Sequence, residues 1–142
     1  GAGGSARAVV WALREAGAGE VSIWNRTAER AAGLAAEFDV RHVAAPEAAD
    51  LVVNCTAVGL DKEMAEADAV AAVGLERIDR PASFFDLNYG AELTQLGHWA
   101  QGGGGRVIDG LEMLVRQGAR SLERWTGQPA PLEAMRAGAR GA

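Results

Sequence analysis

The chain has 142 residues, of which 49% are hydrophobic and 23% are charged, a balance typical of a globular protein with a buried core. Its formal net charge of -5 excludes a general nucleic-acid or anionic-membrane binder, because either would need a basic face. Cys55 is the one cysteine and cannot form an internal disulfide. With no signal-peptide pattern and no apolar run of membrane-spanning length, we expect a cytoplasmic protein.

The predicted elements alternate between helix and strand. In chain order they are a helix over 6–16, a strand over 20–24, a helix over 27–38, a weak strand over 40–43, a helical turn over 46–49, a strand over 51–55, an irregular stretch with some helix over 60–80, a strand over 83–87, a helix over 92–100, a strand over 106–109 and helices over 111–126 and 132–139. This alternation predicts parallel βαβ units, and therefore a Rossmann-like α/β fold with a doubly wound sheet in a three-layer αβα arrangement.

A glycine-rich turn opens the chain, with the residues Gly1, Ala2, Gly3, Gly4, Ser5 and Ala6. The spacing matches G-x-G-x-x-A, in which the glycines allow a tight turn and a close approach of the backbone to a pyrophosphate. The helix that follows would direct its N-terminal N–H groups at the phosphates. The alternative is an ordinary turn in a glycine-rich sequence.

The predicted strand over 20–24 is followed by arginines, at the place where an NAD-binding domain carries an acidic residue. The residues there are Asn25, Arg26 and Thr27, and Arg30 follows one helical turn later. A guanidinium can bind a 2′-phosphate through two hydrogen bonds, whereas a carboxylate would repel it. The pattern therefore favours NADP over NAD. The alternative is that both arginines are solvated surface charges.

A strand normally leads into such a glycine turn, and none precedes Gly1. In a Rossmann fold that strand is central, with the order 3-2-1-4-5-6. We therefore expect residues 1–142 to be a Rossmann domain whose first strand is missing by truncation, with a gap between the strands at 20–24 and 51–55. Unpaired backbone groups there cost about 1–3 kcal/mol each, so the isolated chain is expected not to be a stable monomer.

Several segments, in order and at natural spacing, resemble the NADP-binding half of the shikimate dehydrogenase family. They are GAGGSARA, NRTAER, VVNCTAVGL, DLNY and DGLEMLVRQGARSLERWTG. The resemblance covers nearly the whole chain, and its most specific motif is the run from Asp109 to Gln117.

The resemblance implies a role for each matching residue. Gly1 to Ser5 match the phosphate-binding turn, and Asn25 to Arg30 match the site of the adenosine 2′-phosphate. Thr56, Leu87, Gly110 and Met113 match positions on the nicotinamide side. Tyr89 and Gln117 match residues that bind the hydroxyl and carboxylate groups of shikimate. Without the resemblance, Tyr89 would be read as a residue at the end of a strand, Gln117 as a surface residue and Met113 as core.

Two departures from the family pattern bear on the choice of substrate. Ala57 stands where the family has serine in its N-A-T-S turn, and Gly90-Ala91 replaces the usual continuation after the tyrosine. Both leave the expected fold unchanged. They leave open whether the substrate is shikimate or quinate.

The family implies an NADP-dependent oxidoreductase that interconverts 3-dehydroshikimate and shikimate in chorismate and aromatic amino acid biosynthesis. Its small-molecule partners would be NADP and shikimate, with neither nucleic acid nor membrane, and a homodimer is conceivable for the full-length protein. The family's catalytic Lys–Asp pair belongs to an N-terminal substrate domain, which is absent from this sequence. Lys62, the only lysine, lies in no such motif, so we expect no catalytic residue and no metal ligand here, and a fragment inactive alone. The alternatives are a non-catalytic NADP-binding module and a quinate-using relative.

Overall fold

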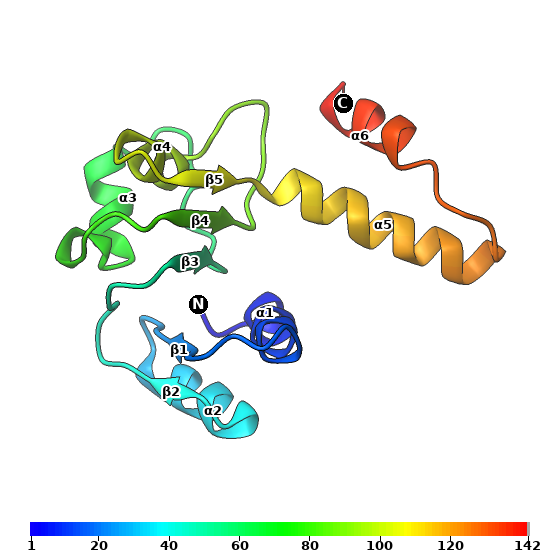
Figure 1. Cartoon of the computed structure of the whole chain (residues 1–142). Coiled ribbons are helices and arrows are strands. Elements are labelled where there is room, and N and C mark those ends of the chain that lie inside the picture. The colour runs from blue at the N-terminus through cyan, green and yellow to red at the C-terminus, as the bar shows by residue number, and fades with distance from the viewer. Residues whose placement is uncertain (142) are drawn as a thin grey trace.

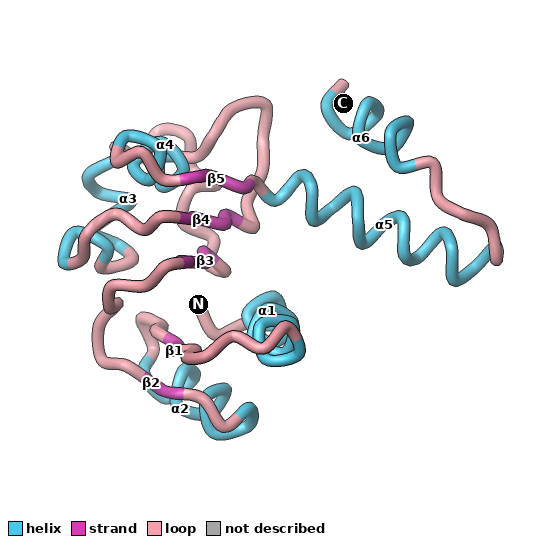
Figure 2. Tube along the Cα trace, viewed as in Figure 1, coloured by secondary structure: helices cyan, strands magenta, loops and turns pink. Residues whose placement is uncertain are grey.

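The computed structural model describes residues 1–141 and shows six helices, one short 3-10 helix and five strands in that part of the chain (Figures 1 and 2). The elements are α1 (Gly4–Glu15), β1 (Ser22–Ile23), α2 (Ala28–Phe38), β2 (Arg41–His42), β3 (Leu51–Asn54), α3 (Glu66–Ala72), η1 (Leu75–Arg77), β4 (Ser83–Asp86), α4 (Gln95–Gly102), β5 (Arg106–Ile108), α5 (Gly110–Thr126) and α6 (Leu132–Arg140). The predicted α/β class is confirmed, with helices between β1 and β2, between β3 and β4 and between β4 and β5.

The strands form two parallel sheets. β1 pairs with β2, and a second sheet has the order β3-β4-β5. The register places Asn54 of β3 beside Asp86 of β4, so the carboxyl ends of these strands lie at one edge. Helix α2 packs on the first sheet and α4 on the second. The sequence predicted the parallel pairing.

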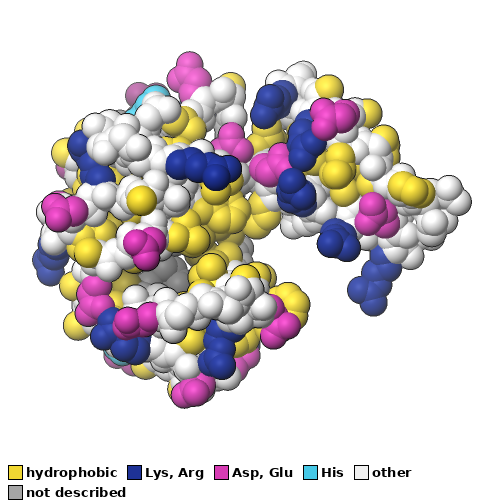
Figure 3. Space-filling model, in the orientation of Figure 1, with side chains coloured by type: hydrophobic (Ala, Val, Ile, Leu, Met, Phe, Trp, Pro, Cys, Tyr) yellow, Lys and Arg dark blue, Asp and Glu magenta, His cyan; other side chains and the backbone are white. Residues whose placement is uncertain are grey.

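A groove separates β1 from β3, where the sequence predicts a gap in the sheet. Its volume is about 610 Å³, and its walls include Val9 and Val10 of α1, Ile23 of β1 and Val52 of β3. Hydrophobic side chains are visible in the hollow between the two parts of the molecule in Figure 3. β1 and β3 are not hydrogen-bonded to each other, so each strand has a free edge toward this groove.

The buried residues form two hydrophobic clusters, one for each sheet. The first, between α1, β1 and α2, includes Val10, Ile23 and Leu34. The second, around β4 and α4, includes Phe84, Leu96 and Trp99, and the Phe84 and Trp99 rings meet edge to face at 6.2 Å. Two half-buried residues connect the clusters. Trp24, which follows β1, packs on the second cluster, and Cys55, which follows β3, packs on the first.

Two predicted helical segments differ from the structure. Residues 46–49 form no helical turn, so that prediction is wrong. Helix α4 begins at Gln95 rather than at residue 92, because the Thr94 hydroxyl caps it by accepting a hydrogen bond from the Gly97 nitrogen at 3.1 Å. The irregular stretch at 60–80 contains α3 and η1, as expected.

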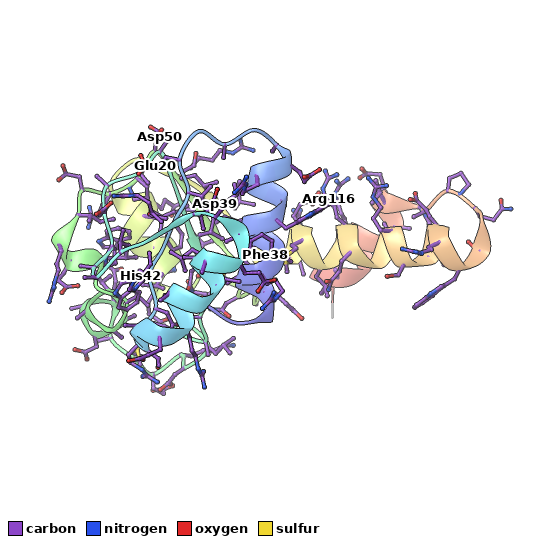
Figure 4. The ribbon with its side chains drawn as sticks, turned by 90° about the horizontal axis from the view of Figure 1, so that it is seen from below. Glu20, Phe38, Asp39, His42, Asp50 and Arg116 are labelled. Atoms are coloured by element: carbon purple, nitrogen blue, oxygen red, sulfur yellow. The ribbon has the colours of Figure 1, made fainter. Side chains whose placement is uncertain are left out.

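Hydrogen bonds from Arg14 connect α1 to the C-terminal end of α2. The guanidinium of Arg14 donates to the backbone oxygens of Phe38 and Asp39. Asp39 ends α2 in the left-handed conformation, with φ of 51°. Figure 4 labels both residues at the end of α2. A cation at a helix C-terminus is favourable because it compensates the helix dipole.

Helices α5 and α6 pack on each other and extend away from the two sheets (Figures 1 and 4). Glu112 of α5 accepts hydrogen bonds from Arg136 of α6 at 2.8 and 3.0 Å, and from Arg116 at 2.7 Å. The hydrogen bonds from Arg136 lower the pKa of Glu112 to about 2. None of the helices within residues 1–141 is both long and apolar enough to cross a membrane.

Candidate functional site

The predicted site residues gather at the carboxyl ends of the parallel strands, where open α/β sheets bind ligands. The Gly1 nitrogen donates to the Trp24 oxygen at 2.8 Å, which places the glycine turn beside the segment after β1. A Cβ on Gly1 would lie 2.7 Å from the Cys55 oxygen, so the turn also touches the residue before Thr56. The turn therefore lies between the segments that follow β1 and β3.

The N-terminus of α1 is open to an anion. Gly3 is its N-cap, no side chain caps it, and its first turn has no acidic residue. Each of the other α-helices in residues 1–141 has a side-chain cap, an acidic residue in its first turn or both. A Cβ on Gly3 or Gly4 would touch nothing within 4 Å. The free N–H groups of this turn can bind a phosphate.

The arginines predicted to bind a 2′-phosphate lie on the surface at the start of α2. Arg26 and Arg30 are exposed, and neither takes part in any of the ion pairs found within residues 1–141. The Asn25 amide donates to the Thr27 oxygen at 2.9 Å and holds the bend before the helix. Thr27 is the N-cap residue of α2, but its side chain makes no capping hydrogen bond. Two guanidinium groups and a free hydroxyl therefore face solvent together.

Thr56 lies in a tight turn that is held by the buried side chain of Asn54. The Asn54 Oδ1 accepts from the Thr56 nitrogen at 3.0 Å and from the Thr56 hydroxyl at 2.7 Å. The Thr56 Oγ1 accepts in turn from the Val58 nitrogen at 3.1 Å. The Asn54 Nδ2 donates to the Val58 oxygen at 3.0 Å. The turn over 54–58 is thus fixed by its own side chains.

Asp86, at the end of β4, is 2% exposed and joins three segments. Its carboxylate accepts from the Asn54 amide at 2.9 Å, the Asn88 nitrogen at 3.0 Å and the Thr94 hydroxyl at 2.6 Å. Burial raises the pKa of Asp86, and the hydrogen bonds from Thr94, Asn88 and Asn54 oppose that rise. The carboxylate is therefore a structural acceptor, with its hydrogen-bonding capacity used inside the protein.

Leu87 and Gly110 meet through their backbones. The Leu87 nitrogen donates to the Asn54 oxygen at 3.1 Å, and the Gly110 nitrogen donates to the Asn88 oxygen at 3.2 Å. A Cβ on Gly110 would lie 2.1 Å from the Leu87 oxygen, so only glycine fits there. The start of α5 is held against the segment that follows β4.

The two predicted substrate residues, with Met113, lie next to this contact. Tyr89 is 49% exposed at the end of the DLNY motif. Met113 and Gln117 lie about one and two turns along α5 from Gly110, so both share a helix face with it. Met113 is half-buried, whereas Gln117 is exposed. Met113 and Gln117 lie on α5, and Tyr89 follows Asn88 in the chain. The Gly110 contact therefore places the start of α5 beside the segment of Tyr89.

Sequence reasoning missed Asn54, Asp86, Asn88 and Asp109 as site residues. Asp109 caps α5 by accepting from the Leu111 nitrogen at 3.1 Å. The available signal was a polar side chain directly after an apolar strand, a position where parallel sheets place functional groups. The hydrogen bonds that join Asn54 to Asp86 and Asn88 to the 54–58 turn, however, connect residues about 30 positions apart, and a single sequence does not reveal them.

Two reactive side chains lie outside any catalytic arrangement. Lys62 is exposed. Burial raises the pKa of the Cys55 thiol to about 11, so it is protonated at neutral pH. Within the described residues no cluster of three or more His, Cys, Asp or Glu side chains could hold a metal ion.

Comparison with protein families identifies the relatives of this chain. A model described as shikimate / quinate 5-dehydrogenase matches residues 1–90, and one described as the shikimate 5′-dehydrogenase C-terminal domain matches residues 110–139. The chain belongs to the shikimate/quinate dehydrogenase family. The first match spans the glycine turn through the DLNY motif, and the second covers α5 and α6.

Named members of the shikimate/quinate dehydrogenase family align along the chain. A shikimate dehydrogenase (NADP(+)) from Methanocella arvoryzae is 40% identical over 155 residues, which cover 100% of this chain and 54% of that protein. A shikimate 5-dehydrogenase from Thermus thermophilus, solved with NADP(H) and shikimate, has a TM-score of 0.87 and 40% identity. That alignment covers 99% of this chain and 52% of the Thermus chain.

A third relative shows that the family's fold carries other activities. A 5-ketofructose reductase from a Gluconobacter strain is 25% identical, with a TM-score of 0.78, over 99% of this chain and 54% of its own. The chain thus spans about half the length of the relatives that it matches. Family membership is therefore settled for this half, and the substrate of a whole enzyme is a separate question.

Proposed function

We propose that the chain is the NADP-binding half of a shikimate dehydrogenase, an oxidoreductase that interconverts 3-dehydroshikimate and shikimate. The observation that carries the proposal is the convergence of the open N-terminus of α1, the free arginines at Arg26 and Arg30 and the Gly110 contact at one edge of the strands. In this proposal residues 1–142 form one domain, including α5 and α6. Its partners are small molecules, and its compartment is the cytoplasm, where the lone Cys55 stays reduced.

The residues fit NADP along the length of the cofactor. Gly1 to Ser5 would hold the pyrophosphate at the open N-terminus of α1, where no acidic side chain competes with it. Asn25, Arg26, Thr27 and Arg30 would hold the 2′-phosphate, since both guanidinium groups are free of ion pairs within residues 1–141. Thr56, Leu87, Gly110 and Met113 would line the nicotinamide end.

The chemistry divides between the cofactor and the protein. When bound, NADP supplies the hydride acceptor or donor. Tyr89 and Gln117 would orient the substrate through its hydroxyl and carboxylate groups, and the rigid 54–58 turn would keep the nicotinamide pocket in place. The accompanying proton needs a general acid–base pair, which none of these residues supplies. We propose that this pair belongs to a separate substrate-binding domain.

A different polyol or keto substrate is the second candidate, supported by the likeness to 5-ketofructose reductase. The departures at Ala57 and Gly90 directly follow Thr56 and Tyr89, the residues proposed for the nicotinamide and the substrate, so a change of specificity could act through them. Quinate is a further option within the family.

The proposal is tested in a chimera in which this chain replaces the matching half of the Thermus thermophilus enzyme. We expect NADP-dependent oxidation of shikimate in preference to quinate, and reduction of 3-dehydroshikimate in preference to 5-ketofructose. Arg26→Ala should weaken NADP binding by roughly 1.5–3 kcal/mol, the range for a hydrogen bond to a charged group, and leave NAD binding nearly unchanged. Arg120→Ala, an exposed arginine on α5, is the control. Equal losses for NADP and NAD would contradict the 2′-phosphate site.

A further inference from the structure

The side chain of Asn88 occupies a central position among the segments of the site. Its Nδ2 donates to two backbone oxygens of the turn after β3, to Thr56 at 3.1 Å and to Val58 at 2.9 Å. Each of these carbonyls lies in the 54–58 turn that Asn54 also holds. Asn88 therefore connects two loops that are about 30 residues apart in the chain.

The backbone of Asn88 makes two further connections. Its nitrogen donates to the buried carboxylate of Asp86 at 3.0 Å, and its oxygen accepts from the Gly110 nitrogen at 3.2 Å. Gly110 is the first residue of α5, the helix that carries Met113 and Gln117. Tyr89 follows directly in the sequence. One residue thus contacts the 54–58 turn, the end of β4 and the start of α5.

We propose that Asn88 is a positioning residue, which sets the relative placement of the 54–58 turn, the 87–89 segment and the start of α5. This inference rests on the proposed function, because those three segments carry the nicotinamide-side and substrate-side residues. The phosphate-binding residues at Gly1–Ser5 and Arg26 make none of the Asn88 contacts. Loss of the Asn88 amide should therefore disturb the geometry of the reacting groups more than the affinity for the cofactor.

The chain offers a matched control at Gln95. Its side-chain amide also donates to two backbone oxygens of the long connection after β3, to Asp61 at 2.9 Å and to Met64 at 3.0 Å. Gln95→Leu removes two hydrogen bonds of the same kind, and none of them involves the Gly110 contact. It should lower stability in the same way as Asn88→Leu without changing the arrangement of the site.

The experiment compares Asn88→Leu, Asn88→Ala and Gln95→Leu in the same chimera, with activity normalised to the folded fraction measured by circular dichroism. For Asn88→Leu we expect kcat to fall roughly 10- to 100-fold, the effect of misplacing reacting groups by about 1 Å, with KM for NADP changed less than about threefold. The kinetic isotope effect with substrate deuterated at the transferred hydrogen should rise. Gln95→Leu should change neither kcat nor the isotope effect.

The outcomes separate the two proposals. A parent chimera without NADP-dependent activity contradicts the proposed function itself. An active parent in which Asn88→Leu and Gln95→Leu have the same kcat and isotope effect overturns the role of Asn88 alone. If neither Asn88 variant folds while Gln95→Leu does, Asn88 is a stability residue and the positioning role is also overturned. A lower kcat with a larger isotope effect only in the Asn88 variants supports it.

Discussion

The Gly110 nitrogen donates to the Asn88 oxygen at 3.2 Å, and this hydrogen bond brings the first turn of α5 against the end of the DLNY motif. The approach is close enough that a Cβ on Gly110 would meet the Leu87 oxygen at 2.1 Å and the Asn88 oxygen at 3.0 Å. Both obstacles are backbone atoms, which cannot rotate away. The position of α5 therefore depends on this one glycine.

Gly110→Ala should lower the free energy of unfolding by about 1–3 kcal/mol, because the added methyl overlaps backbone and forces the helix to shift. Chemical denaturation of the chimera measures this change. Gly118→Ala, in the middle of the same helix, is the control. Its methyl would meet only the flexible end of Met135 at 3.2 Å, and alanine favours a helix by about 0.8–1 kcal/mol over glycine. Equal losses at both positions would contradict the steric argument.

The Cys55 thiol should react slowly with alkylating reagents. Burial raises its pKa from 9.0 to about 11, so the thiolate fraction at pH 8 falls by roughly 100-fold. Labelling rates with iodoacetamide, measured with and without denaturant, test this. The rate should increase strongly on unfolding. A rate in the folded protein equal to that of a small-molecule thiol would show that Cys55 is accessible and ionised.

The attachment of α6 to α5 should weaken in acid. The hydrogen bonds from Arg136 lower the pKa of Glu112 from 4.5 to about 2, so the folded state favours the carboxylate. Its stabilisation is therefore fully present above about pH 4.5 and is lost as the pH falls toward 2. The protection factors of the α6 amides, which correct for the slower intrinsic exchange in acid, should fall over this range. In Glu112→Gln the protection factors should be lower at pH 6 already and depend less on pH. Identical pH profiles in the two proteins would rule out this ion pair as the cause.

Tyr89→Phe and Gln117→Ala test the substrate side of the proposed site. Each should reduce kcat/KM for shikimate roughly 10-fold or more in the chimera, because a hydrogen bond to a charged or polar group is lost, while KM for NADP stays nearly constant. Gln101→Ala, an exposed glutamine near the end of α4, provides the comparison. A loss of NADP affinity without a change in shikimate kinetics would move both residues to the cofactor side.

Local patterns predicted much of the fold, and the reasons lie in particular residues. The apolar run at 51–54 and the stripe of α5 have periods that are typical of strands and helices, and both elements appear at nearly the expected bounds. The helical turn predicted at 46–49 is wrong, since Pro46 and its neighbours form no helical hydrogen bonds. Spacing predicted the position of the glycine turn before α1 and of the arginines at the start of α2, and their roles in binding the cofactor stay predictions. The network through Asp86 and Asn88 was not, since its hydrogen bonds cross between loops about 30 residues apart.

The two hydrophobic clusters give the molecule two partly independent folding units. Each sheet has its own core, and within residues 1–141 the half-buried side chains of Trp24 and Cys55 pack from one part of the molecule onto the cluster of the other. Without a ligand, the two units should therefore lose their structure separately rather than in one cooperative transition. A cofactor that binds the glycine turn, the end of β1 and the end of β3 at once would tie the two units together. The ligand would then act on folding cooperativity as well as on catalysis, and a single sharp transition would be the signature of the bound state.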